Sequence, residues 1–204
     1  RAGMPYRLVG ATRFYARREI KDVIAFLRLI HNPAEGVSMT RVINVPPRGI
    51  GQKTLSTLED AAEERDVSVY EVLRGLPDSL GSRAQKKLIA FLVMLDGWIA
   101  ARDHMTVAQL IDRMLEDTAY GDYLRDGTEE GEDRWGNVLE LRNVAAEYAD
   151  STLTEFLADV ALVSDVDNLS EDVDAPTLLT LHAAKGIEFP VVFITGLEKG
   201  LLPH

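Results

Sequence analysis

The chain has 204 residues, of which 46% are hydrophobic, and this is enough to bury a core and to form one or two domains. It has no cysteine, which excludes disulfides and thiolate metal sites, and its four histidines are too scattered to predict a metal cluster. It has no apolar run of about 18 residues, so no membrane span is predicted.

The net charge of −11 would argue against nucleic-acid binding if it were spread evenly, but it is not. Residues 1–54 contain ten Lys and Arg against three Asp and Glu, a net charge of +7. Residues 55–176 contain ten against 28, a net charge of −18, and the last 28 residues are balanced. This asymmetry indicates a basic face that meets a polyanion, although a chance excess of arginine on solvated helices is the alternative.

The first elements are predicted as a short strand over residues 6–9 and then a helix over 19–30, which Asn32-Pro33 ends. The helix is predicted from apolar residues that recur on one face, namely Ile20, Val23, Ile24, Leu27 and Ile30. On local physics alone, its charged residues are expected to form a solvated face: Glu19, Lys21, Asp22 and Arg28. A short helix is expected over 38–44 and a longer one over 52–65.

Two glycines stand just before the helix predicted at 52–65, in the turn Pro46-Pro47-Arg48-Gly49-Ile50-Gly51. Glycines at a helix start let backbone N–H groups approach a phosphate, and the helix end adds partial positive charge. Arg48 and Lys53 add full charges beside them. The predicted grip on duplex backbone reads no sequence and comprises Arg48, Gly49, Ile50, Gly51, Lys53 and Thr54. An ordinary glycine turn with a helix cap is the alternative.

The middle of the chain is predicted to be helical throughout. Four pairs have capping-box spacing: Ser68 and Glu71, Ser82 and Gln85, Thr106 and Gln109, Thr152 and Glu155. The longest helix is expected over 83–102, with an apolar stripe that includes Leu88 and Trp98. An acidic loop is expected over 126–133, a helix over 134–148 and a linker over 165–176.

Near the end of the chain, two apolar runs at 178–181 and 191–194 predict strands on either side of a small-residue turn. The turn carries Lys185 and Gly186, and Glu188 follows it. Strand, polar turn and strand is how α/β proteins place ligand-binding groups at strand ends. Because this piece and the N-terminal one each look incomplete, we expect one α/β domain that an inserted helical domain interrupts.

Three stretches together resemble superfamily 1 DNA helicases of the UvrD/PcrA/Rep type. They are F-Y-A-R-R-E-I-K-D from Phe14, R-V-I-N-V-P-P-R-G-I-G from Arg41, and the segment 177–204, which resembles motif V and its extension. The resemblance implies a mainly α fold. Residues 17–174 would form the helical 2B subdomain, and 1–16 and 175–204 would be pieces of an incomplete RecA-like domain, 2A.

The resemblance also implies a function. The parent protein would move 3′ to 5′ on single-stranded DNA and couple ATP hydrolysis with Mg²⁺ to strand separation, in DNA repair or replication, as a cytoplasmic, nucleoid-associated protein. Thr180, His182 and Lys185 would face single-stranded DNA, and Glu188 with Gly186 would contribute to the ATP site. The Gly-Ile-Gly element would contact duplex at the junction.

No sequence of the form G-x-x-x-x-G-K-[ST] occurs in the chain, since Gln52 precedes Lys53. We therefore expect this fragment alone not to hydrolyse ATP, because it also lacks the family's Mg²⁺-binding acids and motif VI arginine. Two alternatives stay open. The helical part could be a protein-interaction and autoinhibitory module that meets repair or replication proteins, or the parent could be a helicase–nuclease of the RecB or AddA kind.

Overall fold

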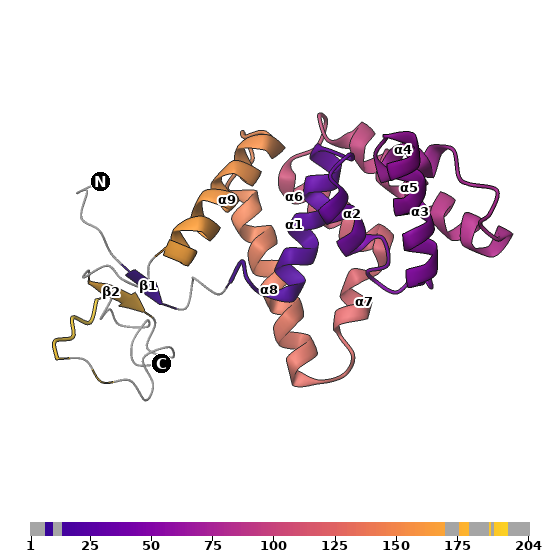
Figure 1. Ribbon diagram of the computed structural model, residues 1–204. Helices are drawn as coiled ribbons and strands as arrows, with labels where there is room; N and C mark the ends of the chain where they lie inside the picture. Colours follow the sequence, from indigo (N-terminus) through magenta and orange to yellow (C-terminus); the bar gives the residue numbers. More distant parts are fainter. Residues whose placement is uncertain (1–6, 10–13, 170–175, 180–187, 189, 196–204) are drawn as a thin grey trace.

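The computed structural model describes residues 7–9, 14–169, 176–179, 188 and 190–195. Within these ranges it is a helical body beside a small parallel sheet, and Figure 1 shows the helices on one side and the two strands on the other. The mainly α class predicted from the sequence is confirmed. In chain order the elements are β1 (Arg7–Val9), α1 (Arg18–His31), α2 (Gly36–Val42), α3 (Gln52–Arg65), α4 (Val69–Arg74), α5 (Ser82–Ala101), α6 (Val107–Thr118), α7 (Tyr120–Leu124), α8 (Glu129–Ala146), α9 (Leu153–Leu169) and β2 (Thr177–Leu179).

Helix α1 lies at the centre of the body, and α2, α5, α6, α8 and α9 all pack against it. The apolar face predicted for it is buried, as its spacing indicates. Ala25, Phe26 and Leu29 are buried as well, so the helix is enclosed on most sides. Phe26 meets Trp98 of α5 edge to face, with ring centroids 5.8 Å apart. The core is therefore built around α1.

This enclosure corrects the prediction that the charged residues of α1 form a solvated face. Lys21 and Arg28 are exposed, but Glu19 is only 5% and Asp22 only 3% exposed. Both carboxylates are buried because polar side chains from α2, α7 and α8 reach them. A buried carboxylate is stable only with such partners, and local helical spacing does not reveal them.

Three of the four predicted capping boxes are confirmed. They open α4, α6 and α9, with reciprocal hydrogen bonds between Ser68 and Glu71, Thr106 and Gln109, and Thr152 and Glu155. The fourth, Ser82 with Gln85, is wrong because Ser82 is already the first residue of α5. Its N-cap is Gly81, which has no side chain to bond the helix start.

The acidic stretch predicted as a loop over 126–133 is largely helical, since α8 begins at Glu129. Thr128 caps this helix by accepting the backbone N–H of Gly131 at 3.0 Å. Three acidic residues stand in the first turn, where the helix dipole favours negative charge. Helix α9 likewise continues to Leu169, into the predicted linker 165–176, and residues 170–175 lie outside the described ranges.

Strands β1 and β2 pair in parallel, with Arg7 opposite Thr177 and Val9 opposite Leu179. The segments that flank the helical body therefore meet in one sheet. The strand predicted at 191–194 is not formed, and its four side chains are 54–87% exposed. A strand needs a neighbour for its backbone hydrogen bonds, and within the described residues β2 pairs only with β1.

None of the described helices has the length and apolar character that crossing a bilayer requires.

Candidate nucleic-acid interface

The loop between α2 and α3 carries the residues predicted to bind duplex DNA, and Asn44 fixes its shape. The Asn44 side-chain oxygen accepts the backbone N–H groups of Arg48 at 2.8 Å and Ile50 at 3.1 Å. Ile50 is only 2% exposed, so its side chain anchors the loop in the core and does not face a ligand. Gly49 has φ +69°, a conformation that glycine adopts without strain. The loop is therefore a defined turn that leaves Gly49 and Gly51 exposed.

The guanidinium of Arg48 faces inward, and this corrects the expectation that its charge lies free beside the loop. Its Nη1 donates to the carbonyl oxygens of Val45 at 2.8 Å and Val42 at 3.0 Å, near the C-terminal end of α2. The guanidinium carbon also lies 5.1 Å from the ring centroid of Phe91 in α5. Burial lowers the pKa of Arg48 to about 10. Arg48 therefore stabilises the loop from its buried side.

The start of α3 offers backbone donors to the solvent. Gly51 is the N-cap, and its carbonyl accepts the N–H groups of Thr54 at 2.9 Å and Leu55 at 3.2 Å. The amides of Gln52 and Lys53 precede these, so the helix itself has no acceptor for them. No side chain caps this end and its first turn holds no acidic residue, whereas the first turn of α8 holds three. Together with the exposed Lys53, this gives a concentrated positive potential.

A second cation lies at the loop that sequence reasoning missed. The Lys87 ammonium in α5 donates to the carbonyl oxygen of Gly49 at 3.0 Å. A β-carbon added at Gly49 would lie 2.2 Å from that ammonium nitrogen, so the close approach needs glycine. The two residues are 38 positions apart, and no local pattern in the sequence pairs them. The Arg48 guanidinium points inward, and it is the Lys87 ammonium that places a positive charge at the loop.

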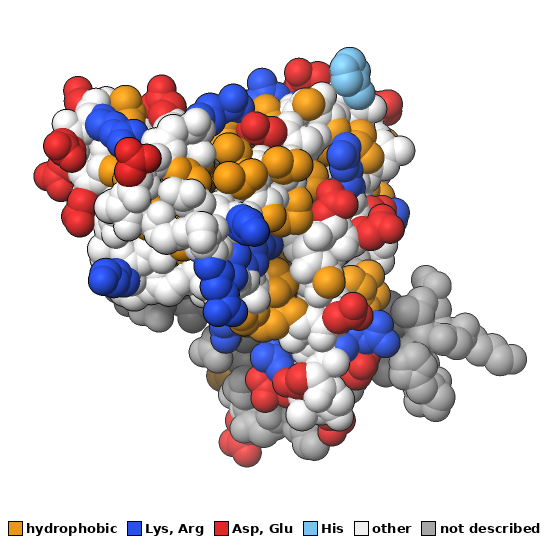
Figure 2. Space-filling view, turned by 90° about the vertical axis from the view of Figure 1, so that its right-hand side faces the viewer, with side chains coloured by type: hydrophobic (Ala, Val, Ile, Leu, Met, Phe, Trp, Pro, Cys, Tyr) orange, Lys and Arg blue, Asp and Glu red, His pale blue; other side chains and the backbone are white. Residues whose placement is uncertain are grey.

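Figure 2 looks onto the side of the molecule where α3, α4 and α5 lie in Figure 1. Lys and Arg side chains form a column near the middle of this face, with hydrophobic side chains beside it (Figure 2). Acidic side chains gather more towards the edges of the same view. Positive charge is thus concentrated locally on a chain that is acidic in sum.

A buried polar network joins α1 to α2, α7 and α8. Asp22 pairs with Arg41 of α2 at 2.7 Å and accepts the hydroxyl of Tyr120 of α7 at 2.9 Å. Glu19 accepts the side-chain amide of Asn137 of α8 at 2.7 Å. Burial, and then the neighbouring Asp22 carboxylate, raise the pKa of Tyr120, so its hydroxyl stays protonated as a donor. This network fixes how α2, α7 and α8 sit on α1.

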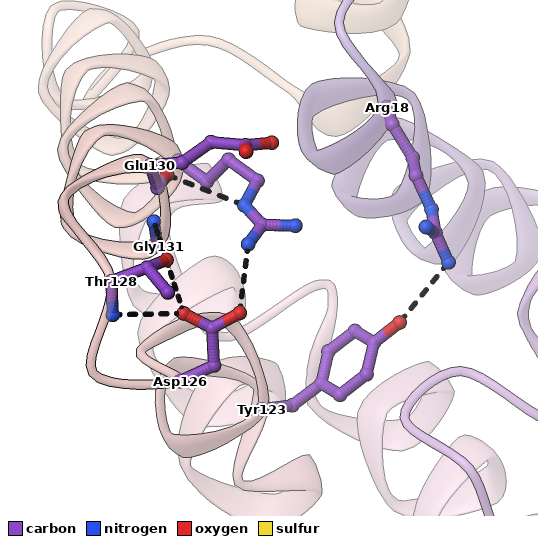
Figure 3. Close-up of polar contacts among 7 residues, drawn as sticks. Arg18, Tyr123, Asp126, Thr128, Glu130 and Gly131 are labelled. Atoms are coloured by element: carbon purple, nitrogen blue, oxygen red, sulfur yellow. Dashed lines mark hydrogen bonds and ion pairs between the residues drawn. The ribbon is translucent and has the colours of Figure 1, made fainter.

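A pocket of about 240 Å³ lies between α1, α7 and α8, and Glu19, Asp22 and Tyr120 of this network are part of its lining. In its lining, Arg18 donates to the Tyr123 hydroxyl at 3.1 Å (Figure 3). Asp126 pairs with Arg134 at 3.1 Å and accepts the hydroxyl and the N–H of Thr128. The bonds from Thr128 lower the pKa of Asp126, which therefore stays ionised. Three carboxylates and two arginines line the pocket, and no cluster of described residues could hold a metal ion. This pocket offers a polyanion no excess of positive charge.

The predicted contacts to single-stranded DNA and ATP fall mostly outside the described residues. Thr180, His182, Lys185 and Gly186 all lie there. Glu188 is described; it has no regular secondary structure, and its side chain is exposed. The structure thus brings together the loop residues but leaves the C-terminal set as a prediction.

Comparison with known proteins agrees with the resemblance seen in the sequence. All of residues 1–204 match the family described as UvrD-like helicase C-terminal domain. The chain is similar to ATP-dependent DNA helicase PcrA of Bacillus subtilis (strain 168), with 38% identity over all of the chain, and to PcrA of Staphylococcus aureus (strain Mu50), with 34% identity. In both cases it covers only 29% of the relative's length. The chain therefore belongs to the UvrD-like helicase family, in which it corresponds to the C-terminal domain.

Proposed function

We propose that the chain is part of an ATP-dependent DNA helicase of the UvrD/PcrA type, which moves 3′ to 5′ in DNA repair or replication. Its helical part, residues 17–174, would be the 2B subdomain, flanked by pieces of the RecA-like domain 2A at 1–16 and 175–204. Support comes from the family match over the whole chain and from the names of its relatives. The parallel pairing of β1 with β2 supports the view that the flanking pieces belong to one domain.

Within that machine, we propose that the helical part grips the duplex backbone at the start of α3. The observation that carries this proposal is the uncapped helix start at Gly51, with Lys53 exposed beside it and no acid in its first turn. Phosphate oxygens accept hydrogen bonds from such amides and are attracted by the lysine. Gly49, Lys53 and Thr54 would lie at the DNA, and Arg48 and Ile50 would shape the loop from inside. Contacts of this kind read no base sequence.

For the C-terminal segment, we propose that Thr180, His182 and Lys185 face single-stranded DNA. Glu188, with Gly186, would contribute to an ATP site that residues outside this chain complete. The exposed carboxylate of Glu188 fits this use, because it is accessible to a sugar hydroxyl. ATP and Mg²⁺ would serve the complete helicase, and we expect the chain alone not to hydrolyse ATP.

A second candidate function is a protein-interaction and autoinhibitory role for the helical part. The net charge of −18 over residues 55–176 favours it, because an acidic surface suits protein partners better than DNA. Repair and replication proteins would then be the partners. Weak DNA binding together with strong partner binding would favour this role over the duplex grip.

The duplex grip is tested by fluorescence anisotropy of this chain with a labelled hairpin duplex that carries a 3′ tail, over a salt series. A plot of log K against log salt has a negative slope. Lys53→Gln should make this slope shallower by about 0.9, the value of one phosphate contact on duplex DNA. Lys21→Gln, at an exposed lysine on α1, is the matched control and should bind as the wild type does. Equal slopes for all three proteins would refute a phosphate contact at α3.

A further inference from the structure

Four cations in the first parts of α3 and α5 have no carboxylate partner among the described residues, although the chain is rich in acids. They are Lys53 on α3 and Arg83, Lys86 and Lys87 on α5. The ion pairs found within the described ranges all use arginines elsewhere, on α1, α2, α4 and on residues between 102 and 142. The first 14 residues of α5, up to Leu95, include no Asp or Glu. This part of α5 therefore carries three cations and no acid of its own.

The contact between Lys87 and Gly49 fixes where the cations of α5 lie. Because the Lys87 ammonium bonds the Gly49 carbonyl, this face of α5 turns towards the loop. Arg83 precedes Lys87 by four residues, so it lies on the same face about 6 Å further along the helix axis. Arg83 is exposed, and Lys87 keeps further donors besides the one on Gly49.

We infer that Arg83 and Lys87 extend the duplex-binding surface from the start of α3 onto α5, as a second row of contacts to phosphates. This inference rests on the proposed duplex grip and enlarges it. Lys87 would bridge the two rows, since the same ammonium touches the loop and carries a charge that the loop's own arginine turns inward. The surface would track the sugar–phosphate backbone and would read no base sequence.

An acidic protein segment is the competing partner for a basic surface. It would draw affinity from apolar contacts, and α5 does expose Ile89 and Val93, at 49% and 65%. At 3.6 residues per turn these two lie roughly 120° or more around the helix from Lys87. Ile89 and Val93 therefore point away from Lys87, which faces the loop, although other hydrophobic side chains lie beside the basic column (Figure 2). The absence of acids from the first 14 residues of α5 favours a polyanion as the partner, and a comparison with poly-glutamate separates DNA from an acidic protein.

The test uses the same hairpin duplex and salt series with Arg83→Gln, Lys87→Gln and the double variant. Glutamine keeps an N–H donor for the Gly49 carbonyl but removes the charge, so thermal unfolding should stay unchanged while DNA binding responds. Each single change should make the negative slope of log K against log salt shallower by about 0.9 and should weaken binding roughly eightfold at 0.1 M salt. Lys21→Gln again serves as the control.

The inference is overturned if the double variant keeps the wild-type slope while Lys53→Gln lowers it, an outcome that leaves the duplex grip itself intact. It is also overturned if the double variant loses binding to poly-glutamate but keeps its duplex affinity, because the surface would then serve an acidic protein. Loss of salt-sensitive duplex binding by the wild type would overturn the grip and its extension together.

Discussion

The substitution Gly51→Asp should separate DNA binding from stability, because the two respond in opposite directions. Gly51 has φ −81° and ψ 166°, which any residue adopts, and a β-carbon there meets no other atom within 4 Å. Aspartate is also a preferred N-cap residue, whose carboxylate accepts the N–H groups of the first helical turn. The variant should therefore fold as the wild type does.

The stability gain follows from two known contributions. Replacing a glycine N-cap with aspartate gains a few tenths of a kcal/mol, and a negative charge at a helix start adds about 0.3–1 kcal/mol. A total gain near 0.5–1 kcal/mol should raise the urea midpoint of unfolding, while the slope of unfolding free energy against urea concentration stays unchanged.

The effect on DNA has the opposite sign. A carboxylate about 4 Å from a phosphate is repelled by ~1 kcal/mol in bulk water and ~4 kcal/mol near a protein surface. Duplex affinity should consequently fall at least fivefold. Gly51→Asn is the matched control, since it caps the helix without a charge and should lose less affinity. If Gly51→Asp is more stable but binds the hairpin duplex as tightly as the wild type, the start of α3 does not meet a phosphate.

Three further changes test the contacts that hold the loop and the buried polar network around Asp22. Gly49→Ala should destabilise the fold by about 1–2 kcal/mol in urea unfolding, because alanine must enter a left-handed conformation and displace Lys87. Arg48→Met should cost about 2 kcal/mol, since it leaves buried carbonyl groups without their charged donor, and it should not lower the salt slope of any remaining duplex binding. Tyr120→Phe should cost about 2 kcal/mol at pH 7 by removing a donor from the buried Asp22 carboxylate. Because the pKa of Tyr120 is raised on folding, its contribution is complete below pH 10 and decreases at higher pH, so the gap between wild type and Tyr120→Phe should narrow in alkaline unfolding measurements.

Features set by neighbouring residues could be predicted from the sequence. The bounds of α3 were predicted at 52–65, and three capping boxes follow from pairs that are three residues apart. The capping box predicted at Ser82 is wrong because Gly81 just before it is also an acceptable N-cap residue, although a weaker one than serine. The acidic residues of 129–132 also resemble a loop in composition, and only the cap at Thr128 shows that a helix begins there.

Features set by distant residues could not be predicted. Burial of Asp22 depends on Tyr120, which is 98 positions away, and the charge at the loop depends on Lys87. Arg48 looks like a free cation in the sequence, yet the end of α2 supplies the carbonyl groups that turn it inward. The two glycines thus correctly indicate a turn before α3, while contact of this turn with DNA stays a prediction and the side chains that charge it required the fold.

We propose that the helical part of this chain binds the sugar–phosphate backbone of duplex DNA. A comparison of duplex with single-stranded DNA is the first measurement to make. Anisotropy would be measured for the tailed hairpin and for the tail alone, between 20 and 200 mM salt, with folding checked by circular dichroism. The chain should bind the hairpin more tightly than the tail, with a steep fall in affinity as salt rises. A folded chain that binds both DNAs equally, or neither at low salt, would contradict it.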